Sequence, residues 1–273
     1  MTEREPQAHK VPKAGKPIAF ICAVAAIASG CIAPAVAVPH RQAPKPAVSY
    51  PAGLPRLEEL ARRIASRETE LFSVWLQYTY RQYIDIRVEY LGKVTKENLT
   101  IVSEVVFLDD GRREVRVIER RGGFSQLKMG PGVEEVLNNL MPFALTEREL
   151  PHYSLEYLRS EKLGRKLCHI LGVQPREMED GKVYFEGEIW VDARTLQIVR
   201  TVGLPVPQSE SSPFPEFDTM RETVDGKYLF PARTVSNSLL AFPRGAVRIQ
   251  QIVQYKNYRR FGSNVKVGFP DRP

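Results

Sequence analysis

Apolar and polar residues alternate along much of this chain, and the alternation predicts an antiparallel β-sheet. It is clearest in residues 182–201, which read KVYFEGEIWVDARTLQIVRT. One face of the first half carries Phe185, Ile189 and Val191, with polar residues between them. A turn at 192–195 then precedes a run rich in β-branched residues. A period of two on both sides of a turn predicts a β-hairpin.

The stretch 78–90 alternates as well and predicts one long strand with an apolar, tyrosine-rich face. That face includes Tyr78, Tyr80, Ile84 and Ile86. Further strands are predicted at 99–108, 113–121, 153–160, 164–173, 217–224, 227–235 and 246–261. Asp225 and Gly226 fit a tight hairpin turn of type I′. We therefore expect roughly nine to eleven antiparallel strands.

Two stretches have helical character. Residues 56–72 place apolar side chains such as Leu57, Leu60 and Ile64 on one stripe, which predicts an amphipathic leading helix. The insertion 124–151 interrupts the strands with Gly, Pro and a short helix around 133–141. Partly helical insertions of this length often cover a sheet or act as lids.

These elements predict a mainly β fold of the α+β class: a large curled antiparallel sheet, or open half-barrel, covered by the leading helix and the insertion. A sheet that curls toward its apolar face forms a trough, which is filled either by the chain's own core or by an apolar ligand. We expect a cavity lined by the following residues. They are Tyr78, Tyr80, Ile84, Ile86, Phe185, Ile189, Val191, Leu137, Leu140, Met141 and Phe143.

The beginning of the chain resembles an export signal. Basic residues precede an uncharged run at 17–38, and two processing sites are visible. One is an A-x-A site before Val38, and the other is a lipobox-like sequence in which Cys31 is lipidated; an uncleaved anchor is the third interpretation. We expect a signal at 1–37, a Pro-rich linker at 38–55, one half-barrel domain at 56–262 and a tail at 263–273, located in the periplasm or tethered to the bacterial envelope.

The charge and the cysteines narrow the function classes. The net charge is +7, and +5 remains without residues 1–37. Basic pairs such as those at 112–113 and 259–260 are scattered, with no aromatic-interleaved groove, so nucleic acid is not an expected partner. Cys168 is the only thiol after the linker, which rules out an intramolecular disulfide framework and a Cys-based zinc site.

The candidates for chemistry are few. Cys168 and His169 are neighbours on a predicted strand and should point to opposite faces, and His152 follows a proline in a loop. Glu186, Glu188 and Asp192 share one face, which we interpret as the hydrated side of a half-buried sheet. No hydrolase, P-loop, Rossmann or zinc-protease motif is present. We therefore assign no catalytic residue, metal ligand or cofactor, and we expect that the protein is not an enzyme.

Two segments carry a family resemblance. Residues 181–201, with IWVDARTLQIVRT, and residues 225–231, DGKYLFP, resemble an exported family of acidobacterial type. The sheet organisation is distantly similar to the LolA/LolB-like superfamily, which sorts outer-membrane lipoproteins and includes the N-terminal domain of RseB. The resemblance implies an apolar half-barrel cavity for a lipid, an acyl chain or a lipoprotein. An envelope scaffold with a filled core and a protein partner is the alternative, followed by a hydrolase.

Overall fold

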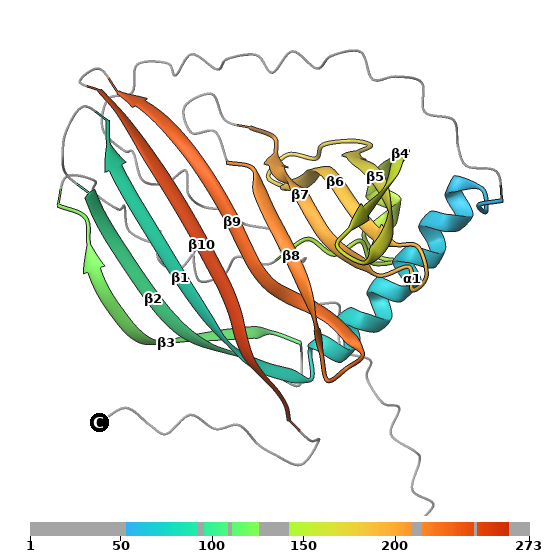
Figure 1. Cartoon of the computed structure of the whole chain (residues 1–273), viewed down its shortest axis with the longest axis horizontal. Coiled ribbons are helices and arrows are strands. Elements are labelled where there is room, and N and C mark those ends of the chain that lie inside the picture. The colour runs from blue at the N-terminus through green and yellow to red at the C-terminus, as the bar shows by residue number, and fades with distance from the viewer. Residues whose placement is uncertain are drawn as a thin grey trace, which may run out of the picture.

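A computed structural model describes residues 53–91, 96–108, 111–125, 142–208, 215–242 and 245–261. They form one 10-stranded antiparallel sheet in the order β3-β2-β1-β10-β9-β8-β7-β6-β5-β4, with one α-helix against it (Figure 1). The elements are α1 (Leu57–Trp75), β1 (Tyr78–Tyr90), β2 (Lys96–Phe107), β3 (Arg113–Gly123), η2 (Leu150–His152), β4 (Tyr153–Leu163), β5 (Lys166–Pro175), β6 (Tyr184–Asp192), β7 (Ile198–Val206), β8 (Phe217–Val224), β9 (Tyr228–Phe242) and β10 (Gly245–Arg260). Since β3 and β4 are the two edges, the sheet is not closed.

The mainly β class, the strand count and the leading helix agree with the sequence prediction. Some bounds differ for local reasons. Gly164 has a φ of +61° and belongs to the turn before β5, so this strand begins two residues later than predicted. β7 ends at Val206 and includes Pro205, which pairs with Phe185 of β6. Asp225 and Gly226 both have positive φ, as the type I′ turn requires.

Register across the sheet places one continuous row of residues on a single face. Successive strand partners link Ile101, Ile84, Val253, Thr234, Thr219, Thr201, Ile189, Leu171 and Tyr157. All nine are buried. Because directly paired residues point to the same side, this row defines the inner face of the sheet. The predicted cavity residues of β1 and β6 therefore lie on the same face, at opposite ends of the row.

Helix α1 lies on this inner face and divides its packing in two. Its last turns supply Leu71 and Trp75 to a first cluster with β1, β2, β9 and β10. Its first half supplies Leu60 and Ile64 to a second cluster with β4–β7. Glu58 and Glu59 in the first turn favour the positive end of the helix dipole. The described residues include no helix long and apolar enough to cross a membrane.

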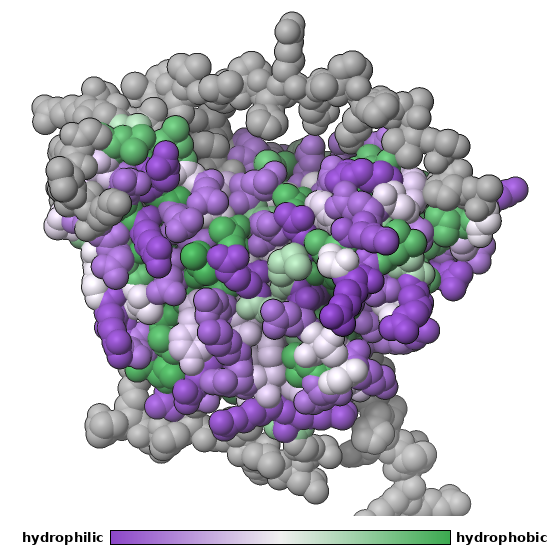
Figure 2. All heavy atoms as spheres, in the orientation of Figure 1, coloured by the Kyte–Doolittle hydropathy of each residue, from purple (hydrophilic) through white to green (hydrophobic). Residues whose placement is uncertain are grey.

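The opposite face is hydrophilic along most of its strands. On β1 the residues between the buried ones are Thr79, Arg81, Tyr83, Asp85, Arg87 and Glu89, which are exposed or half-buried. The side of the molecule turned to the viewer is mostly hydrophilic, with hydrophobic residues in small separate groups (Figure 2). A sheet with one buried and one hydrated face produces the alternation seen in the sequence.

Candidate functional site

The inner face carries a continuous aliphatic surface on β1, β2 and β10. We call it the aliphatic wing, and it consists of Ile84, Ile86, Val88, Leu99, Ile101, Val247, Ile249 and Val253. Each of these side chains is at most 6% exposed. β-Branched residues dominate it because they suit the pleated, half-buried surface of a strand.

Helix α1 packs against the other part of the inner face. Its backbone lies nearest β4, β9 and η2, and Figure 1 shows it on the β4–β8 side of the sheet. Near its end, the Trp75 ring stacks on Tyr80 at a centroid distance of 5.9 Å and contacts Phe107 edge-on at 5.6 Å. This aromatic group closes the lower end of the aliphatic wing. The upper ends of β1, β2 and β10 have no described helix over them (Figure 1).

The second cluster, on β4–β7, is tightly filled. The Phe143 ring stacks on Phe185 with centroids 4.2 Å apart and an interplanar angle of 13°. The Tyr153 hydroxyl accepts a hydrogen bond from the Phe185 backbone N–H at 3.1 Å, and burial raises the pKa of Tyr153 to about 12. Ile189 and Val191 lie in the same cluster as Leu60 and Ile64 of α1.

The predicted cavity residues therefore fall into two groups. Tyr78, Tyr80, Ile84 and Ile86 belong to the first cluster, and Phe185, Ile189, Val191 and Phe143 belong to the second. The remaining predicted residues, Leu137, Leu140, Met141 and the lipidation candidate Cys31, lie outside the described residues, as do most of the predicted signal, linker and tail.

A polar stripe separates the two clusters on the inner face. Thr201, Thr219 and Thr234 occupy the middle of the row that runs across the sheet, and each is at most 6% exposed. The Thr219 and Thr234 hydroxyls are 2.8 Å apart, and the Thr234 hydroxyl is 3.3 Å from that of Tyr255. These hydrogen bonds satisfy hydroxyl groups that burial would otherwise leave unpaired.

A buried ion pair lies beside this stripe, where α1 crosses it. The Arg221 guanidinium donates to both carboxylate oxygens of Glu68 at 2.9 Å and to the Phe143 carbonyl oxygen at 2.9 Å. The backbone N–H of Ile198 also donates to Glu68, at 3.4 Å. A small space of about 20 Å³ borders both charged residues. The pair was not predicted from the sequence. Glu68 is the one charged residue on the apolar stripe of the helix, and this position could have indicated a buried partner of opposite charge.

Two glutamines on the inner face have different surroundings. Gln82 is fully buried, and its side-chain oxygen accepts a hydrogen bond from the Arg113 guanidinium at 2.8 Å. Gln251 is 2% exposed, and among the described residues neither its side-chain nitrogen nor its side-chain oxygen has a hydrogen-bond partner. It interrupts the aliphatic wing between Ile249 and Val253, and sequence reasoning missed it as well.

The Cys168–His169 pair points to opposite faces, as predicted. Cys168 is fully buried on the outer face with Ile170 and Trp190, and burial raises the pKa of its thiol. His169 Nδ1 lies on the inner side, 3.0 Å from the Ser160 hydroxyl. Burial lowers the pKa of His169, and no described carboxylate contributes to the shift. A Ser–His contact without an orienting acid lacks the third group of a hydrolase triad.

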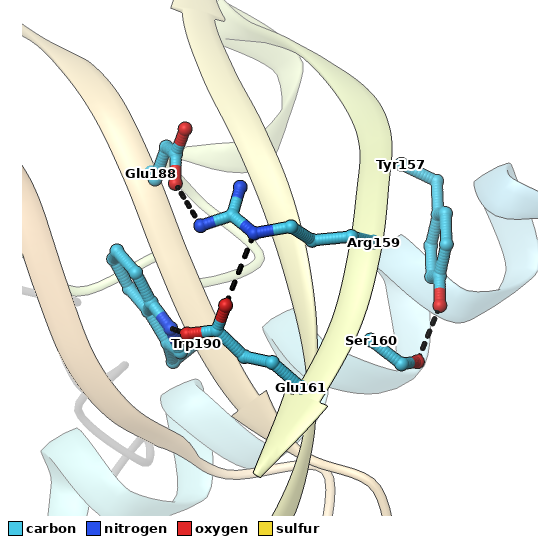
Figure 3. A network of polar contacts seen from close by, with 6 residues as sticks. All are labelled: Tyr157, Arg159, Ser160, Glu161, Glu188 and Trp190. Atoms are coloured by element: carbon cyan, nitrogen blue, oxygen red, sulfur yellow. Dashed lines mark hydrogen bonds and ion pairs between the residues drawn. The ribbon is translucent and has the colours of Figure 1, made fainter. Parts of the chain in front are cut away.

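A charged network covers the outer face around Trp190 (Figure 3). Arg159 and Glu161 project from β4 toward Glu188 and Trp190, whereas Tyr157 and Ser160 project to the other side of the strand. Trp190 donates a hydrogen bond of 2.6 Å to Glu161, and Arg159 bridges Glu161 and Glu188 at 3.1 Å each.

The predicted row of three carboxylates does not act as one group. Asp192 is buried and accepts hydrogen bonds from the Arg194 and Thr195 backbone N–H groups, as expected for an Asp in this turn. Glu186 and Glu188 border an open hollow of about 1,100 Å³ on the outer face, with Val202 and Leu204 in its floor. In the part of the chain that the structure describes, no three His, Cys, Asp or Glu side chains are placed to hold a metal ion.

Comparisons with known proteins find similar solved structures but no related sequence. No protein-family model matches the sequence. The search of curated proteins finds no match either. Among solved structures, the chain is similar to a DUF1329 family protein from Desulfovibrio piger, with 13% identity over 77% of this chain and 94% of the other and a TM-score of 0.39.

Of two further neighbours, one is named for the LolA superfamily and the other for lipoprotein sorting. One is the LolA superfamily protein NE2245 from Nitrosomonas europaea, with 13% identity, coverage of 74% and 94%, and a TM-score of 0.34. The other is an outer membrane lipoprotein-sorting protein domain from Vibrio parahaemolyticus, with 11% identity, coverage of 76% and 95%, and a TM-score of 0.38. Neighbours of the LolA type agree with the resemblance noted from the sequence.

Proposed function

We propose that this chain is an exported protein of the bacterial envelope that binds an acyl chain of a lipid or lipoprotein, without catalysing a reaction. The observation that carries the proposal is the aliphatic wing. Eight aliphatic side chains lie together on one face of one sheet, and no described helix lies over the upper ends of their strands. The structure keeps these side chains out of water, since each is at most 6% exposed, and an apolar ligand that replaced the atoms covering them would keep the gain of about 25 cal/mol per Å². An extended acyl chain has the shape and the chemistry to cover the wing.

The division of the inner face supports this proposal. The β4–β7 side is filled by α1 and Phe143, which makes it a rigid support. The wing differs, because its side chains are aliphatic and lie beyond the aromatic group around Trp75. Binding sites for apolar molecules are commonly concave, apolar and held by a rigid scaffold of this kind.

An envelope scaffold is the second candidate, and the filled β4–β7 cluster favours it. In that function the wing is covered by the protein's own residues, and a protein partner binds elsewhere on the sheet. The two candidates differ in whether the purified protein takes up an acyl chain.

The test begins with protein purified under mild conditions from the envelope of its host. Native mass spectrometry followed by solvent extraction should find one aliphatic ligand per chain. The stripped protein should then bind a fluorescent fatty-acyl probe with saturable, one-site behaviour. Ligand-free protein that also fails to bind the probe would overturn the carrier function and favour the scaffold. Recovery of the protein in the cytoplasmic fraction would contradict the proposed export.

A further inference from the structure

The aliphatic wing contains one polar side chain whose hydrogen-bonding groups are both unused. Gln251 on β10 lies directly opposite Ile86 on β1 and Ser236 on β9, so it faces inward with them. Its side chain is buried, and neither the oxygen nor the nitrogen of its side-chain amide has a hydrogen-bond partner among the described residues. Leaving a buried donor and a buried acceptor unpaired costs free energy, and such groups are rare in folded proteins.

Every inner-face neighbour of Gln251 on β1 and β10 is aliphatic. They are Ile84, Ile86, Val88, Ile249 and Val253, each at most 1% exposed. None of these side chains can donate or accept a hydrogen bond. A leucine at position 251 would continue the alternation of β10 and would remove the free-energy cost of the unpaired donor and acceptor. The requirements of folding alone therefore do not explain the glutamine.

Gln82 provides the internal comparison. It lies on β1 opposite Tyr255 of β10. Tyr255 is four residues from Gln251 along the strand, so the two glutamines are separated by roughly 13 Å in the strand direction. The Arg113 guanidinium donates to the Gln82 side-chain oxygen at 2.8 Å and approaches the Tyr80 hydroxyl at 3.4 Å. The fold thus satisfies one inner-face glutamine with a built partner and leaves the other facing the wing.

We propose that Gln251 determines specificity inside the aliphatic wing, by pairing with an uncharged group on an aliphatic ligand that both donates and accepts a hydrogen bond. A hydroxyl or a carboxamide has this chemistry: the ligand's hydrogen is donated to Oε1 of Gln251, and Nε2 of Gln251 donates back to the ligand's oxygen. The proposal rests on the proposed function, since it assigns the ligand class of the same surface.

The charge of the group follows from the described neighbours. The charged side chains found on this inner face are engaged elsewhere: Arg113 with Gln82 and Tyr80, Arg221 with Glu68, and Glu97, opposite Val88, with the Tyr90 hydroxyl and the Ser125 backbone N–H. A carboxylate or an ammonium group beside Gln251 would be buried among aliphatic side chains without an opposite charge, which is far more costly than burying a hydroxyl. The ligand therefore has an acyl or alkyl chain and a neutral polar group that enters the wing with it.

The test compares three variants of the whole chain: wild type, Gln251→Leu and Gln82→Leu. Each is titrated with dodecanol, dodecanamide, methyl dodecanoate and dodecane, in competition with a fluorescent fatty-acyl probe. Gln251→Leu should weaken dodecanol and dodecanamide about tenfold, the ester about threefold and dodecane not at all, because these probes lose two, one and no hydrogen bonds. The ratio of the first two losses shows whether a hydroxyl or a carboxamide is the better fit.

Thermal unfolding separates a binding role from a structural one. Gln251→Leu should raise the melting temperature, because it removes two unpaired buried groups, whereas Gln82→Leu should lower it, because it removes the oxygen that accepts a hydrogen bond from Arg113. Equal affinity of wild type and Gln251→Leu for dodecanol, or a drop in melting temperature like that of Gln82→Leu, would overturn the assignment while the carrier function stands. If wild type binds neither the fluorescent probe nor any of the four compounds, the proposed function itself fails.

Discussion

Glu68 and Arg221 form a bidentate ion pair between α1 and β8, with two nitrogen–oxygen distances of 2.9 Å. The two side chains are 1% and 4% exposed. They are separated by 153 residues in the chain, so the pair fixes the helix at one position along the inner face. Because the pair lies between the two hydrophobic clusters, it sets which part of the sheet α1 covers and which part it leaves to the aliphatic wing.

Removing one partner of this pair should destabilise the fold strongly. Arg221→Met leaves the Glu68 carboxylate buried without its counter-ion, and we expect a loss of about 3–5 kcal/mol in the free energy of unfolding. The double variant Glu68→Leu/Arg221→Met should recover most of this loss, since no charge remains buried. Urea unfolding followed by circular dichroism measures both values.

The matched control is Arg67→Met, one residue before Glu68 on the same helix. Arg67 pairs with Glu70 at 2.8 Å, but these side chains are 55% and 62% exposed. An exposed pair contributes about 0–1 kcal/mol, so this change should be small. A similar loss for Arg67→Met and Arg221→Met would show that burial does not give the Glu68–Arg221 pair its importance.

Gly187 and Gly203 face each other on β6 and β7, and they admit no side chain. A Cβ on Gly187 would collide with the Val202 carbonyl oxygen and lie 2.9 Å from Cζ of Phe185. Gly187→Ala should therefore cost about 3 kcal/mol or more, through displacement of β7 or of the Phe185 ring. Gly123→Ala on β3, where nothing lies within 4 Å of the new Cβ, should change stability by less than about 0.5 kcal/mol. Equal melting temperatures for the two variants would contradict the close approach of β6 and β7.

His169 should make stability depend on pH in the weakly acidic range. Burial lowers its pKa in the folded state, so the unfolded chain binds the proton more readily. The stability that neutral His169 provides is fully present above its unfolded-state pKa of about 6.5 and is lost as the pH falls through the lower folded value. His169→Gln should therefore show a smaller fall in melting temperature than wild type between pH ~7.5 and ~5.5. An identical fall in both proteins would contradict a buried, neutral histidine.

Cys168 should contribute to packing alone. It is fully buried beside Ile170 and Trp190, and Cys168→Ala should cost about 1–2 kcal/mol through the small cavity that it creates. Binding of the fluorescent acyl probe should remain as in wild type. A folded Cys168→Ala variant that has lost binding would show that the thiol has a direct role.

The alternation of side chains predicted much of the fold, because a half-buried strand imposes a period of two on its own sequence. β1 and β8 have the predicted bounds, and the other strands differ mainly at their ends. A glycine inside a strand indicates a bulge or a close approach of another segment, and Gly187 does lie close against Val202 and Gly203 of β7. Local sequence carries this information, since each strand needs only its own residues to define two faces.

The pairing of distant strands could not be predicted in the same way. The row that joins Ile84 to Ile189 depends on the register between six strands, and no single strand encodes it. The position of α1 depends on Arg221, which is far away in sequence. Gln251 did carry a local signal, because it is a polar residue at a position where β10 alternates to apolar ones. Its meaning depends on Arg113 binding Gln82 instead, which only the folded structure shows.

The most direct test of the acyl-binding wing is the affinity of the fluorescent acyl probe for wild type and for Ile86→Trp, with the melting temperature of each. Ile86 lies on the aliphatic wing, so a tryptophan there should occupy the place of the ligand. The account predicts that Ile86→Trp no longer binds the probe. Because Ile86 is 1% exposed and Ile189 is fully buried, each tryptophan should cost about 1–3 kcal/mol by overpacking, and Ile189→Trp, in the filled β4–β7 cluster, is the control that should keep probe binding. An Ile86→Trp protein that folds and binds the probe as tightly as wild type, or an equal loss of binding in folded Ile189→Trp, would contradict the account.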